Sequence, residues 1–134
     1  MDVLKDKVIF MVEDDALNFA IIRTILRRAG ATVPYDHWGD TTLTRMKEYS
    51  GRLSMILLDL MLPGGVSGYD IFEAIKQHPE IADIPIVAVS AADADIEIPR
   101  AKELGFSGFI SKPIIHDQLP DQLNSILQGK EIWT

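Results

Sequence analysis

Short runs of hydrophobic residues alternate along the chain with longer stretches in which hydrophobic residues recur every three or four positions. Short apolar runs are typical of buried parallel strands, and the longer periodic stretches are typical of helices with one buried face. The apolar runs are Val8 to Val12, Ala31 to Tyr35, Met55 to Leu58, Ile86 to Val89 and Phe109 to Ser111. This alternation predicts an α/β fold, a doubly wound (βα)5 domain with a five-stranded parallel sheet in the order 2-1-3-4-5.

The expected helices follow from hydrophobic spacing and from residues that start or stop helices. They are Ala16 to Ala29, a helix capped by Asp40 and ended by Gly51, Tyr69 to Gln77, a short fourth helix, and Asp117 to Leu127. Pro34 suits a strand at the edge of the sheet, and Pro120 falls in the first turn that a helix tolerates.

The fourth helix is expected to be short because Pro99 falls in the middle of its stretch. An interior proline removes a hydrogen bond and costs about 3 kcal/mol. We therefore predict a helix from Ile98 to Leu104 that follows an acidic loop from Ala91 to Glu97. A continuous helix from Asp93 to Leu104 would contradict this prediction.

Polar residues follow the predicted strands at the points where the strands end. Glu13 and Asp14 follow the first strand, Asp59 the third, Ser90 the fourth and Lys112 the fifth. Ligands of open α/β sheets bind beyond the carboxyl ends of the strands, where the strand order switches direction. Because strands one and three are neighbours at that point, the carboxylates are expected to converge on one crevice.

Crowded carboxylates repel one another, and a divalent cation relieves that repulsion. Oxygen ligands without nearby His or Cys select a hard cation, and an open site suits Mg²⁺ better than Ca²⁺. Helix capping is an alternative role for such acids, but it does not explain Asp59, which ends an apolar run. Beside a hard cation Asp59 could act as a nucleophile toward phosphorus, with Lys112 and Ser90 as partners for the phosphoryl oxygens.

The amino-acid composition and net charge limit the classes of function that this chain can have. The 134 residues contain 47% hydrophobic residues and no cysteine, which predicts one domain, 1–134 with a core of about 7–128, and excludes thiol chemistry. The formal net charge of -7 argues against direct contact with nucleic acid. We expect no membrane span and no export signal, and therefore a cytoplasmic location.

Four motifs in this order, "VEDD", "LLDLMLP", "VAVSA" and "GFISKPI", resemble the receiver domain of two-component response regulators over essentially the whole chain. The resemblance implies a flavodoxin-like fold and a phosphoacceptor, Asp59, that takes phosphate from a sensor histidine kinase or phosphotransfer protein. It further implies that Glu13, Asp14, Asp59 and the Met61 carbonyl hold Mg²⁺, and that Lys112 contacts the phosphoryl group.

The same resemblance implies a switch rather than an enzyme. Ser90 would be the switch hydroxyl and Phe109 the switch aromatic, which turns inward when phosphate arrives, and the Lys112-Pro113 bond would be cis. The surface of the fourth helix, fifth strand and fifth helix would then control a downstream protein partner. Phe109 could instead be a plain core aromatic.

Several alternatives remain open from the sequence. A flavodoxin-like cofactor binder would share the strand order, but an acidic loop after the first strand repels phosphate. An aspartyl-phosphate phosphatase would need a second acid soon after the nucleophile, and a non-phosphorylated receiver could act as a scaffold. The loop from Pro63 to Gly68 is one residue longer than is usual in the family.

The two tryptophans and three histidines lie outside these motifs. Trp38 and Trp133 could anchor a partner or cover an edge of the core. His37, His78 and His116 share no spacing that indicates a metal or catalytic role, and we assign them none.

Overall fold

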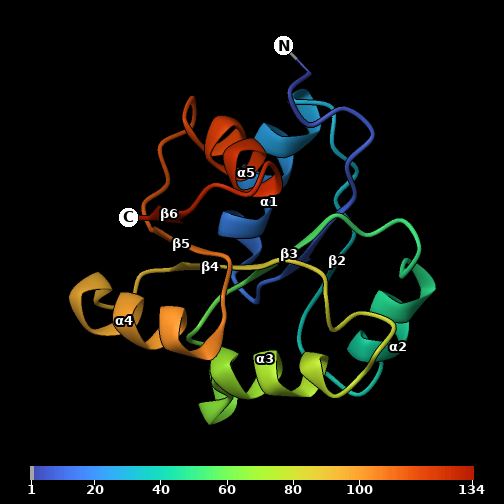
Figure 1. The fold of residues 1–134 in the computed structure, drawn as a ribbon, viewed down its shortest axis with the longest axis vertical. Helices are drawn as coiled ribbons and strands as arrows, with labels where there is room; N and C mark the ends of the chain where they lie inside the picture. Colours follow the sequence, from blue (N-terminus) through green and yellow to red (C-terminus); the bar gives the residue numbers. More distant parts are fainter. Residues whose placement is uncertain (1) are drawn as a thin grey trace.

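The computed structural model describes residues 2–134, which form one parallel sheet between two layers of helices (Figure 1). Six strands lie in the order β2-β1-β3-β4-β5-β6. The strands are β1 (Ile9–Val12), β2 (Tyr35–Asp36), β3 (Met55–Leu58), β4 (Ile86–Ser90), β5 (Gly108–Ser111) and β6 (Ile132–Trp133). The helices are α1 (Ala16–Arg28), α2 (Thr42–Glu48), α3 (Gly68–Lys76), α4 (Ala94–Leu104) and α5 (Leu119–Leu127), with a 3-10 turn, η1 (Pro63–Gly65).

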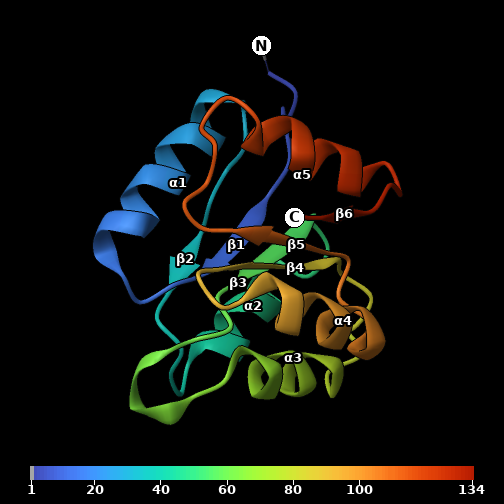
Figure 2. The same cartoon turned by 90° about the vertical axis from the view of Figure 1, so that its left-hand side faces the viewer.

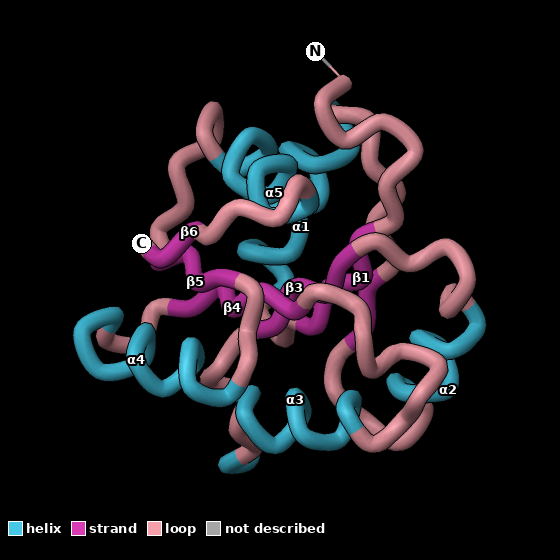
Figure 3. Tube along the Cα trace, in the orientation of Figure 1, coloured by secondary structure: helices cyan, strands magenta, loops and turns pink. Residues whose placement is uncertain are grey.

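The two layers of helices lie on opposite faces of the sheet. Helices α1 and α5 cover one face, and α2, α3 and α4 cover the other, as the views in Figure 2 and Figure 3 both show. Successive residues of β1 alternate between the two hydrophobic clusters: Phe10 packs on the side of α3, and Met11 packs on the side of α1. Both faces of the central strands are therefore buried, which is why their sequences are continuously apolar.

The predicted doubly wound α/β fold and the order of its first five strands are confirmed. The second strand is shorter than expected, because regular pairing with β1 covers only Tyr35–Asp36. The carbonyls of Thr32 and Pro34 nevertheless accept hydrogen bonds from β1 amides, and β2 occupies the edge position that Pro34 suits. A sixth strand, β6, pairs in parallel with β5 at the opposite edge and was not predicted.

The predicted late start of the fourth helix is wrong. Helix α4 runs from Ala94 to Leu104 with Pro99 inside it. Asp93 caps the helix, since its side chain accepts a hydrogen bond from the Asp95 amide, and acidic residues in the first turn favour the positive end of the helix dipole. Packing of the buried Ala101 against the core further offsets the cost of the proline.

Two helix starts also differ from the prediction. Asp40 does not cap α2; Thr41 holds the cap position without a side-chain bond, and Thr42 Oγ1 accepts a hydrogen bond from the Gly39 amide. Helix α5 begins at Leu119 rather than Asp117, with Pro120 in its first turn as expected. The cap of α2 lies one residue later than expected and the start of α5 two residues later, at helix ends where several polar residues compete for the same cap.

The Pro99→Ala variant is expected to be more stable than the natural chain, by about 1 to 3 kcal/mol. Pro99 has no N–H, so the Asp95 carbonyl four residues earlier lacks its helical donor, and alanine restores that bond. Urea unfolding measures the change. The matched control is Pro120→Ala, which alters a proline in the first turn of α5 and should change stability little. Equal effects of the two substitutions would contradict the prediction.

None of the helices in residues 2–134 combines the length and the apolar character that crossing a bilayer requires.

Candidate functional site

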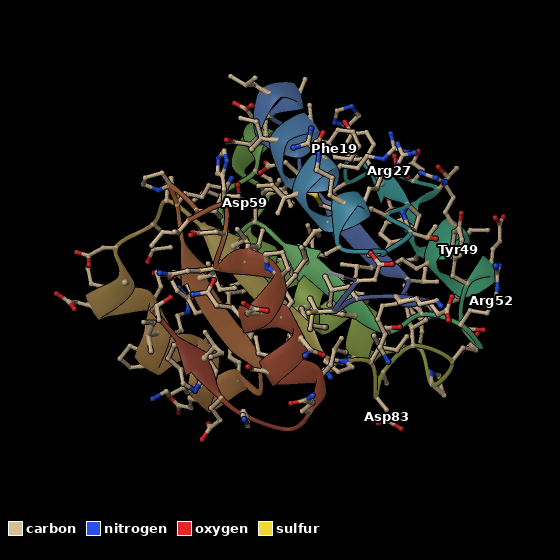
Figure 4. All side chains as sticks on the ribbon, turned by 90° about the horizontal axis from the view of Figure 1, so that it is seen from above. Phe19, Arg27, Tyr49, Arg52, Asp59 and Asp83 are labelled. Carbon is tan, nitrogen blue, oxygen red and sulfur yellow. The ribbon has the colours of Figure 1, made fainter. Side chains whose placement is uncertain are left out.

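A cleft lies beyond the carboxyl ends of the central strands, at the place where β1 and β3 are neighbours. Five of the residues singled out in the sequence line it: Glu13, Asp14, Asp59, Met61 and Lys112. They come from the ends of β1, β3 and β5, which the parallel pairing brings to one edge of the sheet. In Figure 4 Asp59 lies at the opposite end of the molecule from Asp83, which precedes β4. Strand topology therefore assembles the cleft from segments far apart in sequence.

Lys112 lies between two carboxylates in this cleft. Its Nζ atom donates to Glu13 Oε1 at 2.6 Å and to Asp59 Oδ2 at 3.0 Å. The side chains are only 12% exposed for Lys112, 4% for Glu13 and 10% for Asp59. Because water screens such buried charges poorly, the cation strongly stabilises the two carboxylates, and the trio carries an excess of negative charge.

The pKa values of this group follow from burial and from the neighbouring charges. Burial raises the pKa of Glu13, and the charge of Asp59 adds to that rise, although Lys112 opposes it. Burial works to lower the pKa of Lys112, but its bonds to Glu13 and Asp59 outweigh burial, and the net shift is upward. Lys112 is therefore a permanent cation at neutral pH, whereas Glu13 would ionise more readily if further positive charge arrived.

Asp59 is held by backbone and side-chain contacts on both sides. The Met61 amide donates to Asp59 Oδ1 at 3.0 Å, so the two carboxylate oxygens have different partners. The following loop uses Gly64 and Gly65 at positive φ, as the two glycines of the lengthened loop permit. Gly68 then begins α3 directly against the Asp59 carbonyl, a close approach that the sequence analysis missed.

Asp14 faces a different partner. Its Oδ1 atom lies 2.9 Å from Nδ1 of His37, and His37 Nε2 lies 3.0 Å from the Tyr35 hydroxyl. The ring of Tyr35 stacks on Phe19 of α1. The spacing of the histidines does not predict this contact of His37. The signal in the sequence is its place directly after β2, the neighbour of β1.

The carboxylates are grouped as one pair plus a neighbour. Glu13 and Asp59 share Lys112, and Asp14 lines the same cleft while bonded to His37. Within residues 2–134 no three His, Asp or Glu side chains stand close enough to hold a metal ion together as they lie. All the available donor atoms are nevertheless oxygens, which are the ligands that a hard divalent cation prefers. The two buried carboxylates also share only one lysine, so a further cation would balance their charge.

Ser90 and Phe109 lie behind the cleft rather than in its wall. Ser90 is fully buried, and its Oγ atom accepts a hydrogen bond from the Ala92 amide at 3.2 Å, while its carbonyl accepts from the Lys112 amide. Phe109 is also fully buried, within the cluster that includes Phe106 and Ala101. The peptide bond between Lys112 and Pro113 is cis.

The family model for the response regulator receiver domain matches residues 9–124. The chain belongs to the response regulator receiver family. Among its relatives, the polar-differentiation response regulator DivK of Brucella anthropi is 30% identical over 121 residues, which cover 90% of this chain and 96% of DivK. The two-component response regulator ORR7 of Oryza sativa is 30% identical over 106 residues, or 79% of this chain and 50% of ORR7.

Solved structures agree with this assignment. The receiver domain of a response regulator from Rhodospirillum rubrum is 29% identical with a TM-score of 0.70, and the match covers 92% of this chain and 94% of that one. A response regulator from Thermotoga maritima, at 18% identity and a TM-score of 0.77 over 91% of this chain and 98% of its own, shares the fold. This receiver domain is therefore a component of two-component signalling.

Family membership gives the cleft a chemical context. Receiver domains bind Mg²⁺ at their phosphorylation site, and response regulators interact with histidine kinases or phosphotransfer proteins and with downstream targets. Among the described residues that line the cleft, only Asp59 and Glu13 have a buried carboxylate that is bonded to a lysine.

Proposed function

We propose that this receiver domain accepts a phosphoryl group on Asp59 and thereby alters the surface formed by α4, β5 and α5, which a downstream protein reads. The observation that carries the proposal is the Asp59 carboxylate itself. It is nearly buried at the end of β3, with Oδ2 bonded to Lys112 and Oδ1 bonded to the Met61 amide. A carboxylate held in this way presents a fixed nucleophile in the wall of the cleft.

The phosphodonor that fits this chemistry is the phosphohistidine of a sensor histidine kinase or phosphotransfer protein. A carboxylate oxygen of Asp59 attacks phosphorus, an O–P bond forms, the P–N bond breaks, and its electron pair returns to the imidazole. Lys112 already lies at 3.0 Å from Asp59 and is placed to balance charge on the phosphoryl oxygens. No other co-reactant is required.

The residues suited to hold Mg²⁺ are Glu13, Asp14, Asp59 and the Met61 carbonyl. When bound, the ion supplies positive charge that lowers the repulsion between the carboxylates and an incoming phosphoryl group. The raised pKa of Glu13 supports this assignment, because a buried acid that ionises reluctantly gains most from an added cation. Asp14 would turn from His37 or share its carboxylate with it.

Ser90 and Phe109 are the proposed switch. The Ser90 hydroxyl would leave its bond with the Ala92 amide to reach a phosphoryl oxygen, and Phe109 would occupy its inward position when the hydroxyl has moved. Catalysis on a separate substrate is not part of the proposal, since the domain acts on its own aspartate. The absence of cysteine fits a reducing compartment, so we propose a cytoplasmic site of action.

The decisive experiment compares the natural chain with Asp59→Asn after incubation with a small acyl-phosphate donor. We expect the natural chain to gain the mass of one phosphoryl group only when Mg²⁺ is present, and the variant to gain none. Asp70→Asn, an exposed acid in the first turn of α3, is the matched control and should behave as the natural chain does. Phosphorylation of Asp59→Asn, or full phosphorylation in EDTA, would contradict the proposal.

A further inference from the structure

The last strand, β6, closes the edge of the sheet beside β5. It pairs in parallel with Gly108 and Phe109, and the Thr134 amide donates to the Phe109 carbonyl at 2.9 Å. Ser111 Oγ donates to the Thr134 carbonyl at 2.8 Å. Figure 1 shows β6 as the outermost strand next to β5, on the α4 side of the molecule. Residues 132–134 are therefore bonded to the strand that carries the proposed switch aromatic.

Glycine at position 108 permits this close contact. A Cβ atom there would stand 3.0 Å from the Ile132 carbonyl and 2.8 Å from Ile126 Cδ1. The contact with the Ile132 carbonyl is tighter than most Cβ contacts, so a side chain at 108 would require β6 to shift by a few tenths of an ångström. Glycine at this position therefore lets β6 lie close to β5.

Three residues form a row across the sheet on the face that α4 covers. Ala88 of β4 is in register with Phe109, and Phe109 is in register with Trp133. Aligned residues of parallel strands point to the same face, and Trp133 packs on the hydrophobic cluster that contains both Ala88 and Phe109. Phe109 therefore has the small Ala88 on its inner side and a large indole on its outer side.

The indole of Trp133 is itself held in place. Lys102 of α4 lies 5.2 Å from the centre of its ring, and the Nε1 atom donates to the Glu131 carboxylate at 3.2 Å. Phe109 is fully buried, and Trp133 is its neighbour in register on the side toward the edge of the sheet. A Phe109 ring that turned toward this edge would therefore approach the indole.

We propose that Trp133 is a positioning residue that holds Phe109 inward, so that the last strand biases this receiver domain toward the state that carries phosphate. This inference rests on the proposed function, in which inward Phe109 accompanies phosphorylation of Asp59. Trp133 touches neither Asp59 nor Lys112 and acts only through Phe109. Thermodynamic linkage makes the effect reciprocal. A contact that holds Phe109 inward raises the affinity of the Asp59 site for a phosphoryl analogue, and binding of the analogue stabilises the pairing of β6 with β5.

The test measures the affinity of the full chain for beryllofluoride with Mg²⁺, by the ¹⁹F resonance of the bound complex. Trp133→Ala is expected to weaken that affinity by about five-fold or more, the lower range of measured couplings between sites. Trp133→Phe, which keeps a ring beside Phe109, should restore most of it. Ser111→Ala, which removes the bond to the Thr134 carbonyl, is a milder second variant and should weaken binding in the same direction.

The matched control is Tyr49→Ala, which also removes a half-buried aromatic from the same cluster but near α2 and Phe10. It should lower stability without changing the affinity for beryllofluoride. Equal loss in Tyr49→Ala and Trp133→Ala, or natural affinity in both Trp133→Ala and Ser111→Ala, would overturn the inference while leaving the phosphoacceptor proposal intact. If the natural chain binds no beryllofluoride and takes no phosphate, the proposed function itself fails.

A second readout follows the strand directly. In the natural chain, beryllofluoride and Mg²⁺ should slow hydrogen exchange of the Thr134 amide, which bonds to the Phe109 carbonyl. The Asp59→Asn variant should show no such change. Faster exchange on binding would mean that occupation of Asp59 releases the strand, which contradicts the inference.

Discussion

Replacing Lys112 with methionine is expected to lower the free energy of unfolding at pH 7 by about 3 kcal/mol, because it leaves two nearly buried carboxylates without their cation. Glu13 and Asp59 each bond to Lys112 Nζ, and their side chains are almost inaccessible to water. Methionine keeps much of the length and apolar packing of the lysine stem, so the loss reports charge rather than volume. Urea unfolding at several pH values measures it.

The pH dependence distinguishes this electrostatic cause from loss of packing. The pKa of Glu13 is raised in the folded chain, and without Lys112 it should rise further. A carboxyl group whose pKa is raised by folding contributes stability that is present below its unfolded pKa, near 4.5, and is lost as pH rises through the folded value. The loss of unfolding free energy in Lys112→Met should therefore be smaller at pH 5 than at pH 7. Added Mg²⁺ should reduce this loss at pH 7.

The matched control for this substitution is Lys76→Met. Lys76 is a half-buried lysine of α3 whose Nζ donates to the Ala82 carbonyl, far from the acids. Its loss should cost less, and the cost should depend on neither Mg²⁺ nor pH in this range. If Lys112→Met loses the same unfolding free energy at pH 5 and pH 7, and Mg²⁺ does not change that loss, the electrostatic explanation is wrong.

The meeting of Glu13, Asp59 and Lys112 could be predicted because it depends on features that a sequence displays openly. Each follows a short apolar run, and a parallel sheet brings the carboxyl ends of its strands to one edge. Strand order then decides which ends are neighbours, and the handedness of crossovers leaves few choices. Exact side-chain partners are not required for this inference, only the direction of each strand.

The turn of Asp14 toward His37 could not be predicted in the same way. Their side chains meet across 23 positions of sequence, and the choice between His37 and the Glu13–Asp59 pair depends on the short β2 and on the stacking of Tyr35 with Phe19. Hydrophobic periodicity gives no information on which of two nearby partners a partly exposed carboxylate selects. His37 was therefore missed although its residue type suits the contact.

The start of α4 and the presence of β6 were missed for tertiary reasons. Pro99 is tolerated because α4 is held by contacts to α3, where the Tyr69 hydroxyl bonds to Glu97 and Arg100 lies over the Tyr69 ring. Propensity alone does not include these contacts. The two residues of β6 are too few to show a period, and they become a strand only because the edge of β5 is open beside them.

Substitution of Gly68 by alanine is expected to destabilise the fold by about 3 kcal/mol, against the usual trend in helices. Alanine at an unencumbered helical position is favoured over glycine by about 1 kcal/mol. At position 68, however, a Cβ atom would stand 2.4 Å from the Asp59 carbonyl oxygen and 2.6 Å from Leu60 Cα. Both are backbone atoms at the end of a buried strand, so the start of α3 must move instead.

That movement would reach the site as well as the core. The Gly68 amide donates to the Leu60 carbonyl, which ties α3 to the residue that follows Asp59. Displacing α3 should therefore disturb the carboxylate that Met61 and Lys112 orient, and phosphorylation by an acyl-phosphate donor should slow more than stability alone explains. The matched control is Gly51→Ala, where no heavy atom lies within 4 Å of the added Cβ, and we expect little change in unfolding or in phosphorylation. Natural stability in Gly68→Ala would mean that α3 does not depend on this close approach, and that Asp59 owes its position to its side-chain partners alone.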